Sequence, residues 1–544
     1  MAGKVEPALK RSPEPPFPDS AGRGWFIAAI AFMALHVGLA WLGREIGVLT
    51  GQDDVEYMVL AESLRHGTYR ELFHTGAPFH YQYPPGYPAL LGGWGAIAGT
   101  AFDRLVALNI ALSGAALGLL FVTLHRTFDS RFAAVSVGVL AVNPELVRTA
   151  GAIMSEPAYL FLSLLALYLV VRGGDRTRWL VAAGVIAIFA ALTRTVGLTL
   201  VAALTVHWLF ERRWRLVAVP AVIGVTLLGG WLLWSALDDD LRPGFSYVAE
   251  LQSLWSGGGG ARPLFERLPH YAVAYVSDFM PASLAMPTVA GTIIDNVAGI
   301  LLMGVSLAAG WWVLFQRWRT AALYLAAYAL LLAVWLWAVG RFLVPVVPLL
   351  TVAVLAGAGA VAARMRERLR LPATLVFAAV LGLGGALRTG ALVSERWSCA
   401  HDAAWPDIAC LTADQSSYFE ALRWIDATLP QDAVLLSAKS GALWHYTDRR
   451  AVRYAEAMAQ SADGFLPWMR ARGADHIVLA SLWIEDAWAL ADLISANCDQ
   501  IRIEAAFPPR TWVFRIAADV TPAQAAATCA VVAEFVRTVR GRAG

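Results

Sequence analysis

The chain has 544 residues, of which 58% are hydrophobic and 15% charged, and its mean hydropathy is +0.55. Soluble domains carry about 25% charged residues, whereas here apolar runs near membrane-spanning length recur from residue 25 to residue 392. The composition excludes an ordinary soluble enzyme and predicts a polytopic α-helical membrane protein. No basic domain and no basic stripe among aromatic residues indicates nucleic-acid binding, and the formal net charge is only +2.

The N-terminal segment, residues 1–24, is polar and rich in proline, a composition typical of a disordered segment. The apolar run at 25–42 is too long for the core of a signal peptide and lacks a clear small-residue cleavage site. We interpret this run as a retained first membrane helix.

Lysine and arginine clusters separate the apolar runs, and such clusters mark cytoplasmic loops. They lie at 4–23, 126–131, 172–178, 212–215, 317–319 and 364–370. Placing every cluster inside requires about eleven membrane helices. These are expected near 25–45, 104–124, 132–150, 156–172, 178–193, 196–210, 215–236, 291–315, 320–340, 342–362 and 371–392. The N-terminus is then cytoplasmic, and the chain leaves the last helix on the extracytoplasmic side.

One apolar segment, 84–102, is short and rich in Gly and Pro. A full crossing there would place every later arginine cluster outside, so we interpret this segment as a re-entrant or interfacial helix. The membrane domain is thus expected at 25–392, with a first outer loop at 46–103 and another at 237–290.

Residues 393–544 have a different pattern, in which short runs typical of strands alternate with amphipathic helical stretches. The expected strands are "AVLLS", "HIVLAS", "IRIEAAF" and "TWVFRI", and the expected helices are "SSYFEALRWIDATL" and "IEDAWALADLISAN". The alternation predicts a small α/β domain, which the topology places outside the cytoplasm.

All four cysteines lie in this region: Cys399, Cys410, Cys498 and Cys529. Pairing Cys399 with Cys410 would close a short loop and leave Cys498 for Cys529, and four unrelated thiols are the alternative. Disulfides require an oxidising compartment, so the first interpretation agrees with an extracytoplasmic domain.

The expected topology brings several ionisable residues to the outer ends of helices or into the first outer loop. They are Asp53, Asp54, Glu56, His80, Arg148, Glu156, Arg194 and Arg341. An ionisable group at or inside a membrane domain is a functional candidate. Gathered carboxylates can supply a general base, and gathered arginines can bind an anion.

Structural explanations exist for the same carboxylates. Asp53 and Glu56 fit a capping box for a surface helix at 54–66 that ends at Gly67. Taken alone, this pattern favours capping over catalysis, although a cap also holds a carboxylate rigidly. Glu156 precedes a proline, as residues at the start of a helix often do.

The basic candidates have structural explanations too. Arg194 and Arg341 are single arginines between apolar segments, on the side where cytoplasmic positive charge is not expected. Each could instead snorkel to a lipid headgroup. Arg148 fits a headgroup contact, and His80 fits a solvated loop histidine.

The stretch "HYQYPPGYP" at 80–88 combines three prolines with Tyr81, Tyr83 and Tyr87. Prolines stiffen the chain, and tyrosines supply stacking faces with a polar tip. Such a wall suits a sugar or a lipid headgroup, and an interfacial aromatic anchor is the alternative.

In their order along the chain, these features resemble the GT-C superfamily of membrane glycosyltransferases. More narrowly, they resemble its branch of protein O-mannosyltransferases and lipid A aminoarabinose transferases. The matching elements are the acidic pair followed by Tyr57, "YPPGYP", the Glu156–Pro157 pair, Arg194 after "LT", and "GRFLVPVVPLL" at 340–350. The resemblance covers residues 25–392.

The resemblance implies a GT-C fold and a polyprenyl-phosphate-sugar-dependent hexosyl or pentosyl transferase of the cell envelope. It would act at the extracytoplasmic face of the plasma (inner) membrane on a lipid, glycan or protein acceptor. The implied roles are catalysis for Asp53, Asp54 and Glu156, donor-phosphate binding for Arg341, Arg194 and His80, and sugar or acceptor binding for Tyr57, Tyr81, Tyr83 and Tyr87.

Two family features are absent from the sequence. Aminoarabinose transferases carry a lysine before the proline of the first loop. This lysine is absent here, and Tyr83 or Pro84 stands near its place, which weighs against an aminoarabinose donor. The Trp-Trp-Asp signature of oligosaccharyltransferases is missing, which weighs against transfer of a whole oligosaccharide. No motif requires a cofactor, and a divalent metal stays open because carboxylates alone select none.

Two other classes of membrane protein are alternatives. A transporter would carry internal repeats and polar groups near the bilayer midplane, whereas the candidates here gather at one surface. A polymerase or ligase of lipid-linked glycans would share the donor type and carry a long polar outer loop, as 237–290 could be.

Overall fold

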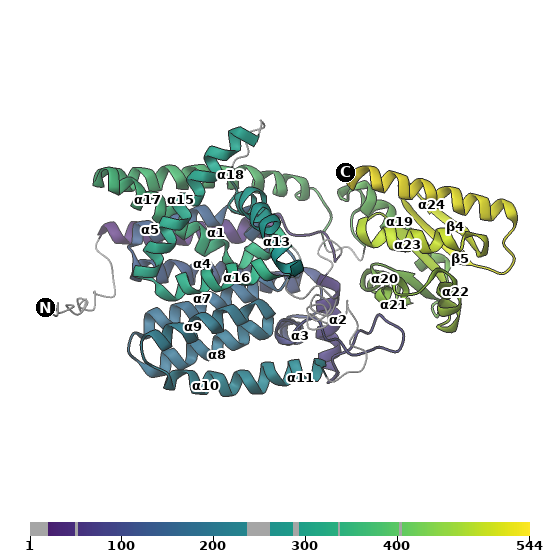
Figure 1. The fold of residues 1–544 in the computed structure, drawn as a ribbon, viewed down its shortest axis with the longest axis horizontal. Helices are drawn as coiled ribbons and strands as arrows, with labels where there is room; N and C mark the ends of the chain where they lie inside the picture. Colours follow the sequence, from purple (N-terminus) through teal and green to yellow (C-terminus); the bar gives the residue numbers. More distant parts are fainter. Residues whose placement is uncertain are drawn as a thin grey trace.

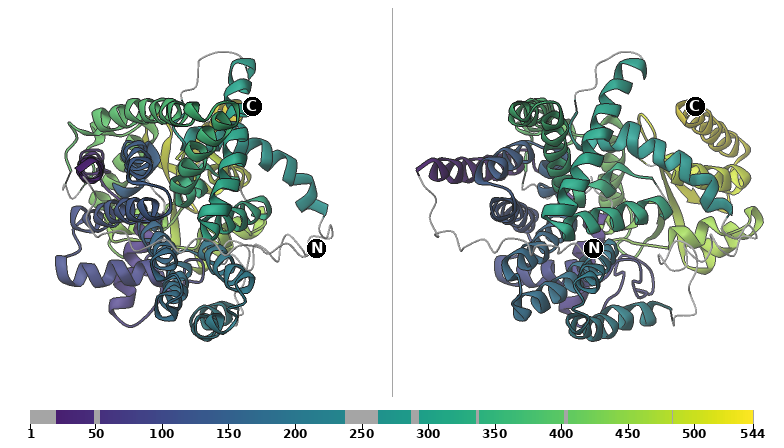
Figure 2. Two further views of the ribbon diagram at one scale, coloured as in Figure 1. Left: turned by 90° about the vertical axis from the view of Figure 1, so that its left-hand side faces the viewer. Right: turned by 60° about the vertical axis from the view of Figure 1, so that its left-hand side comes forward.

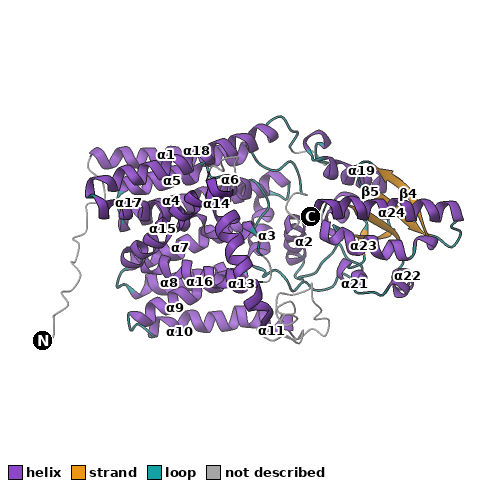
Figure 3. Ribbon diagram, turned by 45° about the horizontal axis from the view of Figure 1, so that its top comes forward, coloured by secondary structure: helices purple, strands orange, loops and turns teal. Residues whose placement is uncertain are grey.

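The structure is a computed structural model, and it describes residues 20–48, 53–236, 262–286, 293–335, 338–401, 405–482 and 484–543. A bundle of long helices forms one part, and a sheet with flanking helices forms the other (Figures 1 and 3). The short helices α2 (Asp53–Arg65) and α3 (Gly86–Ala98) lie between the two parts (Figure 1). The predicted fold class, a polytopic helical membrane protein with a C-terminal α/β domain, is confirmed.

The bundle has a helix at every expected span, and its long helices run side by side (Figure 2). Its helices are α1 (Ser20–Leu42), α4 (Phe102–Thr127), α5 (Ser130–Ala141), α6 (Pro144–Ala150), α7 (Glu156–Gly173), α8 (Thr177–Thr193), α9 (Leu198–Phe210), α10 (Arg215–Gly224), α11 (Gly230–Ala236), α15 (Ile293–Arg317), α16 (Arg319–Val334), α17 (Val347–Met365) and α18 (Arg370–Arg396). Among the described residues, seven helices are individually long and apolar enough to cross a membrane. The count of eleven crossings stays a prediction.

The expected span at 132–150 is bent by 65° between α5 and α6. Pro144 cannot continue a helix because it lacks an N–H group and restricts the residue before it. Asn143 begins α6 instead, since its side-chain oxygen accepts hydrogen bonds from the amides of Glu145 and Leu146, both at 3.1 Å. The break turns the chain toward the end of the bundle where α7 begins.

Small residues let α15 and α17 approach backbone to backbone. A Cβ atom added to Gly310 would lie 1.7 Å from the carbonyl oxygen of Ala353, and one added to Gly357 would lie 1.7 Å from that of Ser306. Close packing through glycine is typical of membrane helices, whose association gains little from the hydrophobic effect.

Helix α3 corresponds to the segment expected to be re-entrant or interfacial. Its 13 residues are fewer than the roughly 20 that a crossing needs. Helix α3 packs on α2 and on the end of α8, where a Cβ on Gly86 would lie 2.6 Å from the carbonyl oxygen of Leu192.

The expected outer loop at 237–290 falls partly outside the described residues. Its described part contains α13 (Arg262–Ala274), a π-helical segment (Tyr275–Phe279) and α14 (Met280–Ser283). These elements pack against α16 and against the 3-10 segment Gly340–Val346. Its extracytoplasmic placement stays a prediction.

The C-terminal domain holds a five-stranded sheet in the order β2-β1-β3-β5-β4. Its strands are β1 (Val434–Ser437), β2 (Arg450–Ala451), β3 (Ala474–Ala480), β4 (Ile501–Phe507) and β5 (Thr511–Ile516). Strand β1 pairs in parallel with β2 and β3, whereas β5 pairs antiparallel with β3 and β4. Its helices are α19 (Ala413–Thr428), α20 (Ser440–Thr447), α21 (Tyr454–Met458), α22 (Ala462–Ala471), α23 (Ile484–Ala496) and α24 (Pro522–Ala543). Every strand and helix named from the sequence is present there.

The segment expected to form the first outer loop is attached to the edge of this sheet. His74 forms a parallel bridge with Ala451 of β2, the edge strand. The amide of Ala451 donates to the carbonyl of Phe73, and the amide of Thr75 donates to the carbonyl of Ala451, both at 3.0 Å. The loop therefore covers an edge that would otherwise expose unpaired backbone groups.

All four cysteines are paired, Cys399 with Cys410 and Cys498 with Cys529. Because disulfides persist in oxidising compartments, we expect a membrane-impermeant maleimide to label these cysteines in intact cells only after an impermeant reductant has acted. Labelling that requires permeabilised membranes would place the C-terminal domain in the cytoplasm and overturn the topology.

Candidate active site

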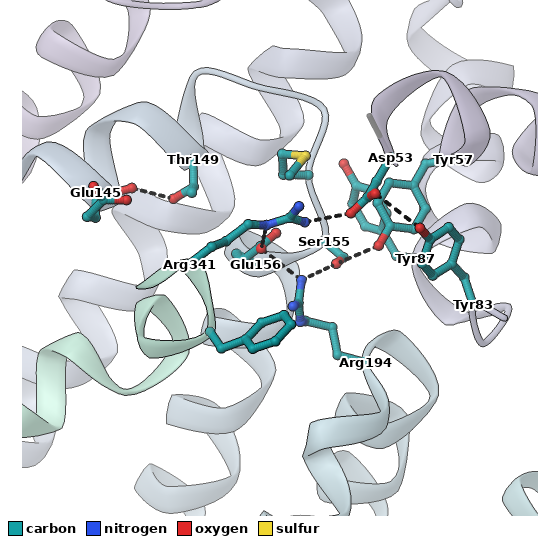
Figure 4. Close-up of polar contacts among 12 residues, drawn as sticks. Asp53, Tyr57, Tyr83, Tyr87, Glu145, Thr149, Ser155, Glu156, Arg194 and Arg341 are labelled. Atoms are coloured by element: carbon teal, nitrogen blue, oxygen red, sulfur yellow. Dashed lines mark hydrogen bonds and ion pairs between the residues drawn. The ribbon is translucent and has the colours of Figure 1, made fainter. Parts of the chain in front are cut away.

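Asp53 stands at the first position of α2 and faces the bundle. The Tyr83 hydroxyl donates to its Oδ1 at 3.0 Å, and Arg341 Nη2 donates to its Oδ2 at 2.8 Å (Figure 4). The helix begins at Asp53, one residue earlier than expected, and the hydrogen bonds of this carboxylate run to side chains from other segments. Asp53 thus serves the contact between α2 and the bundle in place of the expected capping box.

Glu156 begins α7, and its side chain is only 1% exposed. Its Oε1 lies 2.9 Å from Arg194 Nη1 and 2.5 Å from Arg341 Nε (Figure 4). Arg341 therefore bridges Asp53 and Glu156, while Glu156 is shared between two arginines. A buried charge is costly unless it is paired, and here two carboxylates balance two guanidinium groups.

Breaks in the helices place the two arginines. Arg194 has extended backbone after the last turn of α8, and the 3-10 turn Thr195–Gly197 then leads into α9. Arg341 lies in the 3-10 segment that precedes α17, where the Tyr328 hydroxyl donates to the carbonyl of Phe342 at 2.7 Å. Both side chains thus enter the site from irregular backbone between apolar helices.

Ser155 joins the arginines to the tyrosines. Its Oγ accepts a hydrogen bond from Arg194 Nη1 at 2.8 Å and lies 3.0 Å from the Tyr57 hydroxyl (Figure 4). The ring of Tyr57 packs between Tyr83, at 5.1 Å between centroids, and Tyr87, at 4.8 Å. Sequence reasoning missed Ser155, whose only signal was its position before Glu156.

Asn109, which is fully buried, was missed as well, although an amide side chain within an apolar run was a usable signal. Its Nδ2 donates to the carbonyls of Ala152 and Met154 at 2.6 Å and 2.9 Å, which fixes the turn leading into Ser155. Its side chain also exchanges hydrogen bonds with the Tyr87 hydroxyl. Asn109 therefore holds Tyr87 and the turn before Ser155 in position.

The side chains of Asp53, Tyr57, Tyr83, Arg194 and Arg341 border an open pocket with about 610 Å³ of space not filled by atoms, its mouth included. The lining residues are Asp53, Tyr57, Tyr83, Pro84, Thr193, Arg194, Thr195, Val196, Leu331, Leu332, Trp335, Arg341 and Phe342. One wall is charged and aromatic, and the other is apolar. A pocket with such walls suits a molecule with an anionic group beside an apolar chain.

Seven of the residues named from the sequence do not line this pocket: Asp54, Glu56, His80, Tyr81, Tyr87, Arg148 and Glu156. Asp54 is 1% exposed, and its Oδ1 accepts a hydrogen bond from the amide of Val55. His80 is 2% exposed, with its ring against Glu71, and Tyr81 is buried beside Phe79. Arg148, a weaker candidate, pairs with Glu145.

Glu56 lies one turn along α2 from Asp53. Burial, and then the negative charge of Asp53, raises the pKa of Glu56 well above its usual range. Glu56 therefore holds its proton to higher pH than an ordinary glutamate.

Within the described ranges, no group of three or more His, Cys, Asp or Glu side chains is arranged to hold a metal ion.

Replacing Glu156 by glutamine is expected to destabilise the protein, because two largely buried arginines then lose their shared counter-charge. Breaking a buried ion pair from one side generally costs about 3–5 kcal/mol. Thermal unfolding in detergent should show a midpoint lower by several degrees. Glu145→Gln is the matched control, since the Glu145–Arg148 pair is 28% and 38% exposed and should matter little. Equal stability of both variants would contradict this account.

Comparisons with known proteins agree with the geometry. The model of the dolichyl-phosphate-mannose-protein mannosyltransferase family matches residues 82–234. No curated protein sequence matches the chain significantly. ArnT from Cupriavidus metallidurans in the apo state superposes with a TM-score of 0.57 at 16% identity, covering 91% of this chain and 98% of ArnT.

Two further solved structures are similar to the chain. ArnT from the same organism bound to undecaprenyl phosphate gives a TM-score of 0.55 at 16% identity, with the same coverage. The Archaeoglobus fulgidus oligosaccharyltransferase tethered to an acceptor peptide gives 0.54 at 13% identity, covering 92% of this chain and 75% of that one. The resemblance inferred from the sequence is confirmed, and the chain has the fold of the GT-C superfamily of membrane glycosyltransferases.

Proposed function

We propose that the chain is a glycosyltransferase that moves a sugar from a polyprenyl-phosphate-linked donor to a lipid, glycan or protein acceptor. The reaction would take place at the extracytoplasmic face of the plasma membrane. The observation that carries this proposal is the pocket, in which two arginines and a carboxylate face an apolar wall.

The arginines suit the phosphate of such a donor. A guanidinium group has five N–H donors, and within the described residues Arg341 donates through Nε and Nη2 to Glu156 and Asp53. Its Nη1 group is then available to a phosphate oxygen, as are further N–H groups of Arg194. The similar ArnT structure bound to undecaprenyl phosphate supports this class of ligand.

The chemistry requires one base and one anion site. The acceptor nucleophile attacks the anomeric carbon, and the bond between that carbon and the phosphate oxygen breaks. The bonding electrons pass to the departing phosphate, whose growing charge Arg341 and Arg194 stabilise. The proton of the nucleophile passes to the Asp53 carboxylate, while Tyr57 and Tyr83 offer walls for the sugar.

Two measurements test the proposal. Undecaprenyl phosphate should raise the thermal unfolding temperature of the purified protein, since a ligand that binds only the folded state stabilises it. Mass spectrometry of membrane glycolipids and glycoproteins should then reveal a species one sugar heavier in cells that express the protein than in cells that lack it. Absence of both the stabilisation and the mass difference would refute the proposal.

A further inference from the structure

Asp53 is held by a side chain whose own position depends on residues far from the pocket. The Tyr83 hydroxyl donates to Asp53 Oδ1 at 3.0 Å. The backbone amide of Tyr83 donates to Nε2 of His80 at 2.8 Å. The carbonyl of Tyr83 accepts from the Tyr69 hydroxyl at 2.8 Å. Both backbone polar groups of Tyr83 are thus fixed by side chains of the first outer loop.

The hydrogen bond from the Tyr83 amide determines the tautomer of His80. A backbone N–H can only donate, so His80 Nε2 must accept and carries no proton. The ring proton then lies on Nδ1, which is 2.9 Å from Oε1 of Glu71 and donates to it. His80 therefore acts between Glu71 and Tyr83 as a neutral, oriented link, the arrangement by which a carboxylate commonly orients a histidine ring.

Glu71 is a nearly buried carboxylate whose cation comes from the C-terminal domain. Arg453 Nη2 lies 3.2 Å from Glu71 Oε2 and donates to the carbonyl of Phe79 at 3.4 Å. The side chains of Arg453 and Glu71 are 11% and 13% exposed. His74 also faces Glu71, at 3.7 Å, but burial lowers the pKa of His74 to about 4, so it is neutral at physiological pH.

Arg453 is itself well placed by the sheet. It follows the edge strand β2, whose Ala451 pairs with the backbone of residues 73–75 in the same outer loop. Two backbone hydrogen bonds and one ion pair therefore join the loop to the domain within a few residues. A shift of the domain would move Glu71, and with it the ring that holds Tyr83.

We propose that the C-terminal domain is a working part of the active site, in which Arg453 positions Tyr83 against Asp53 through Glu71 and His80. This proposal rests on the proposed role of Asp53 in sugar transfer. Arg453, Glu71 and His80 are positioning residues, since none of them lines the pocket. The ion pair between domain and loop thereby links docking of the domain to the alignment of the catalytic carboxylate.

The first test measures the positioning without any substrate. In hydrogen–deuterium exchange of the full-length protein in detergent, Arg453→Gln should speed exchange in the segment 69–83, the Tyr83 amide included. Arg510→Gln is the matched control, because Arg510 pairs with Asp414 at 3.3 Å within the same domain and is similarly buried. Equal effects of the two variants, or no effect of Arg453→Gln, would overturn the proposal.

A pair of substitutions at His80 separates orientation from packing. Glutamine can place an oxygen near the position of Nε2 and still accept from the Tyr83 amide, whereas the shorter asparagine cannot reach it. His80→Gln should therefore retain slow exchange of this amide, and His80→Asn should lose it. Loss in both variants would mean that His80 acts by its volume alone, against the proposal.

The second test concerns the reaction itself. Given a hydrogen bond's usual contribution, Arg453→Gln and His80→Asn should each lower kcat by about 3- to 10-fold, with the affinity for undecaprenyl phosphate unchanged. In a Tyr83→Phe background, His80→Asn should cause no further loss, since the positioned hydroxyl is already gone. If the double variant instead lost activity by the product of the two single losses, the proposal would be overturned. A wild-type protein without transfer activity would instead refute the proposed function. The exchange measurements would still test whether Arg453 positions Tyr83, because they need no substrate.

Discussion

Asp53→Asn is expected to slow sugar transfer by about 10²- to 10⁴-fold, the usual loss when a general base is removed. Asparagine keeps the size of the side chain and can still accept the hydrogen bond from Tyr83. The four charges of the site then sum to +1 in place of zero, because Arg341 and Arg194 are balanced by Glu156 alone. Undecaprenyl phosphate should consequently bind at least as tightly as before, while kcat falls.

Asp54→Asn is the matched control for this substitution. It makes the same change one residue on, at a carboxylate that contacts the amide of Val55 and does not line the pocket. Its effect on kcat should be much milder. Full activity of Asp53→Asn, together with an unstable Asp53→Ala protein, would show that Asp53 only holds α2 against the bundle.

Arg341→Lys is expected to weaken binding of undecaprenyl phosphate by about 10- to 100-fold although the positive charge is kept. Arg341 reaches Asp53 through Nη2 and Glu156 through Nε, at 2.8 Å and 2.5 Å. A planar guanidinium group can span both carboxylates and still present an N–H group to a phosphate, whereas a lysine ammonium group is a single point of charge. Isothermal titration of the purified protein with undecaprenyl phosphate measures the change, and kcat should fall as well.

Arg148→Lys provides the control for the same chemical change. Arg148 pairs with Glu145, is 38% exposed and does not line the pocket, so the affinity for undecaprenyl phosphate should stay at the wild-type value. If Arg341→Ala leaves this affinity and turnover unchanged, Arg341 serves only to neutralise Asp53 and Glu156. Weaker binding of undecaprenyl phosphate by the Arg341 variant but not by the Asp53 variant would separate the base from the phosphate site.

Most helices and strands of this protein could be predicted from the sequence because their signals are local. Apolar runs and arginine clusters located every bundle helix, and alternating short runs located β1, β3, β4 and β5 of the C-terminal domain. The two-residue strand β2 and the helices α20, α21, α22 and α24 were not predicted. The break between α5 and α6 also has a local cause in the sequence, Asn143 and Pro144, but its angle of 65° depends on what each helix packs against. Hydrophobic periodicity predicts a helix and does not predict the angle between that helix and the next one.

The composition of the candidate site was only partly predictable. Asp53, Glu156, Arg194 and Arg341 were found because ionisable groups stand out among apolar helices, and packing then brought them within hydrogen-bond distance. Ser155 carried no charge and so no comparable signal. The sequence therefore revealed which residues could do the chemistry, whereas their contacts belong to the tertiary structure, since Arg341 lies 185 residues from Glu156 and 288 from Asp53.

Neighbouring residues show most clearly what the sequence determined and what only the tertiary structure decided. Asp53 and Asp54 are adjacent, yet successive residues on a helix point in different directions, so only Asp53 faces the pocket. His80 and Tyr83 share one proline-rich stretch, yet Tyr83 reaches Asp53 while His80 turns to Glu71. Composition and periodicity determined the membrane fold and the set of candidate residues, because both depend on side-chain chemistry along the chain. The direction of each side chain was decided by packing of the outer loop between the bundle and the C-terminal domain.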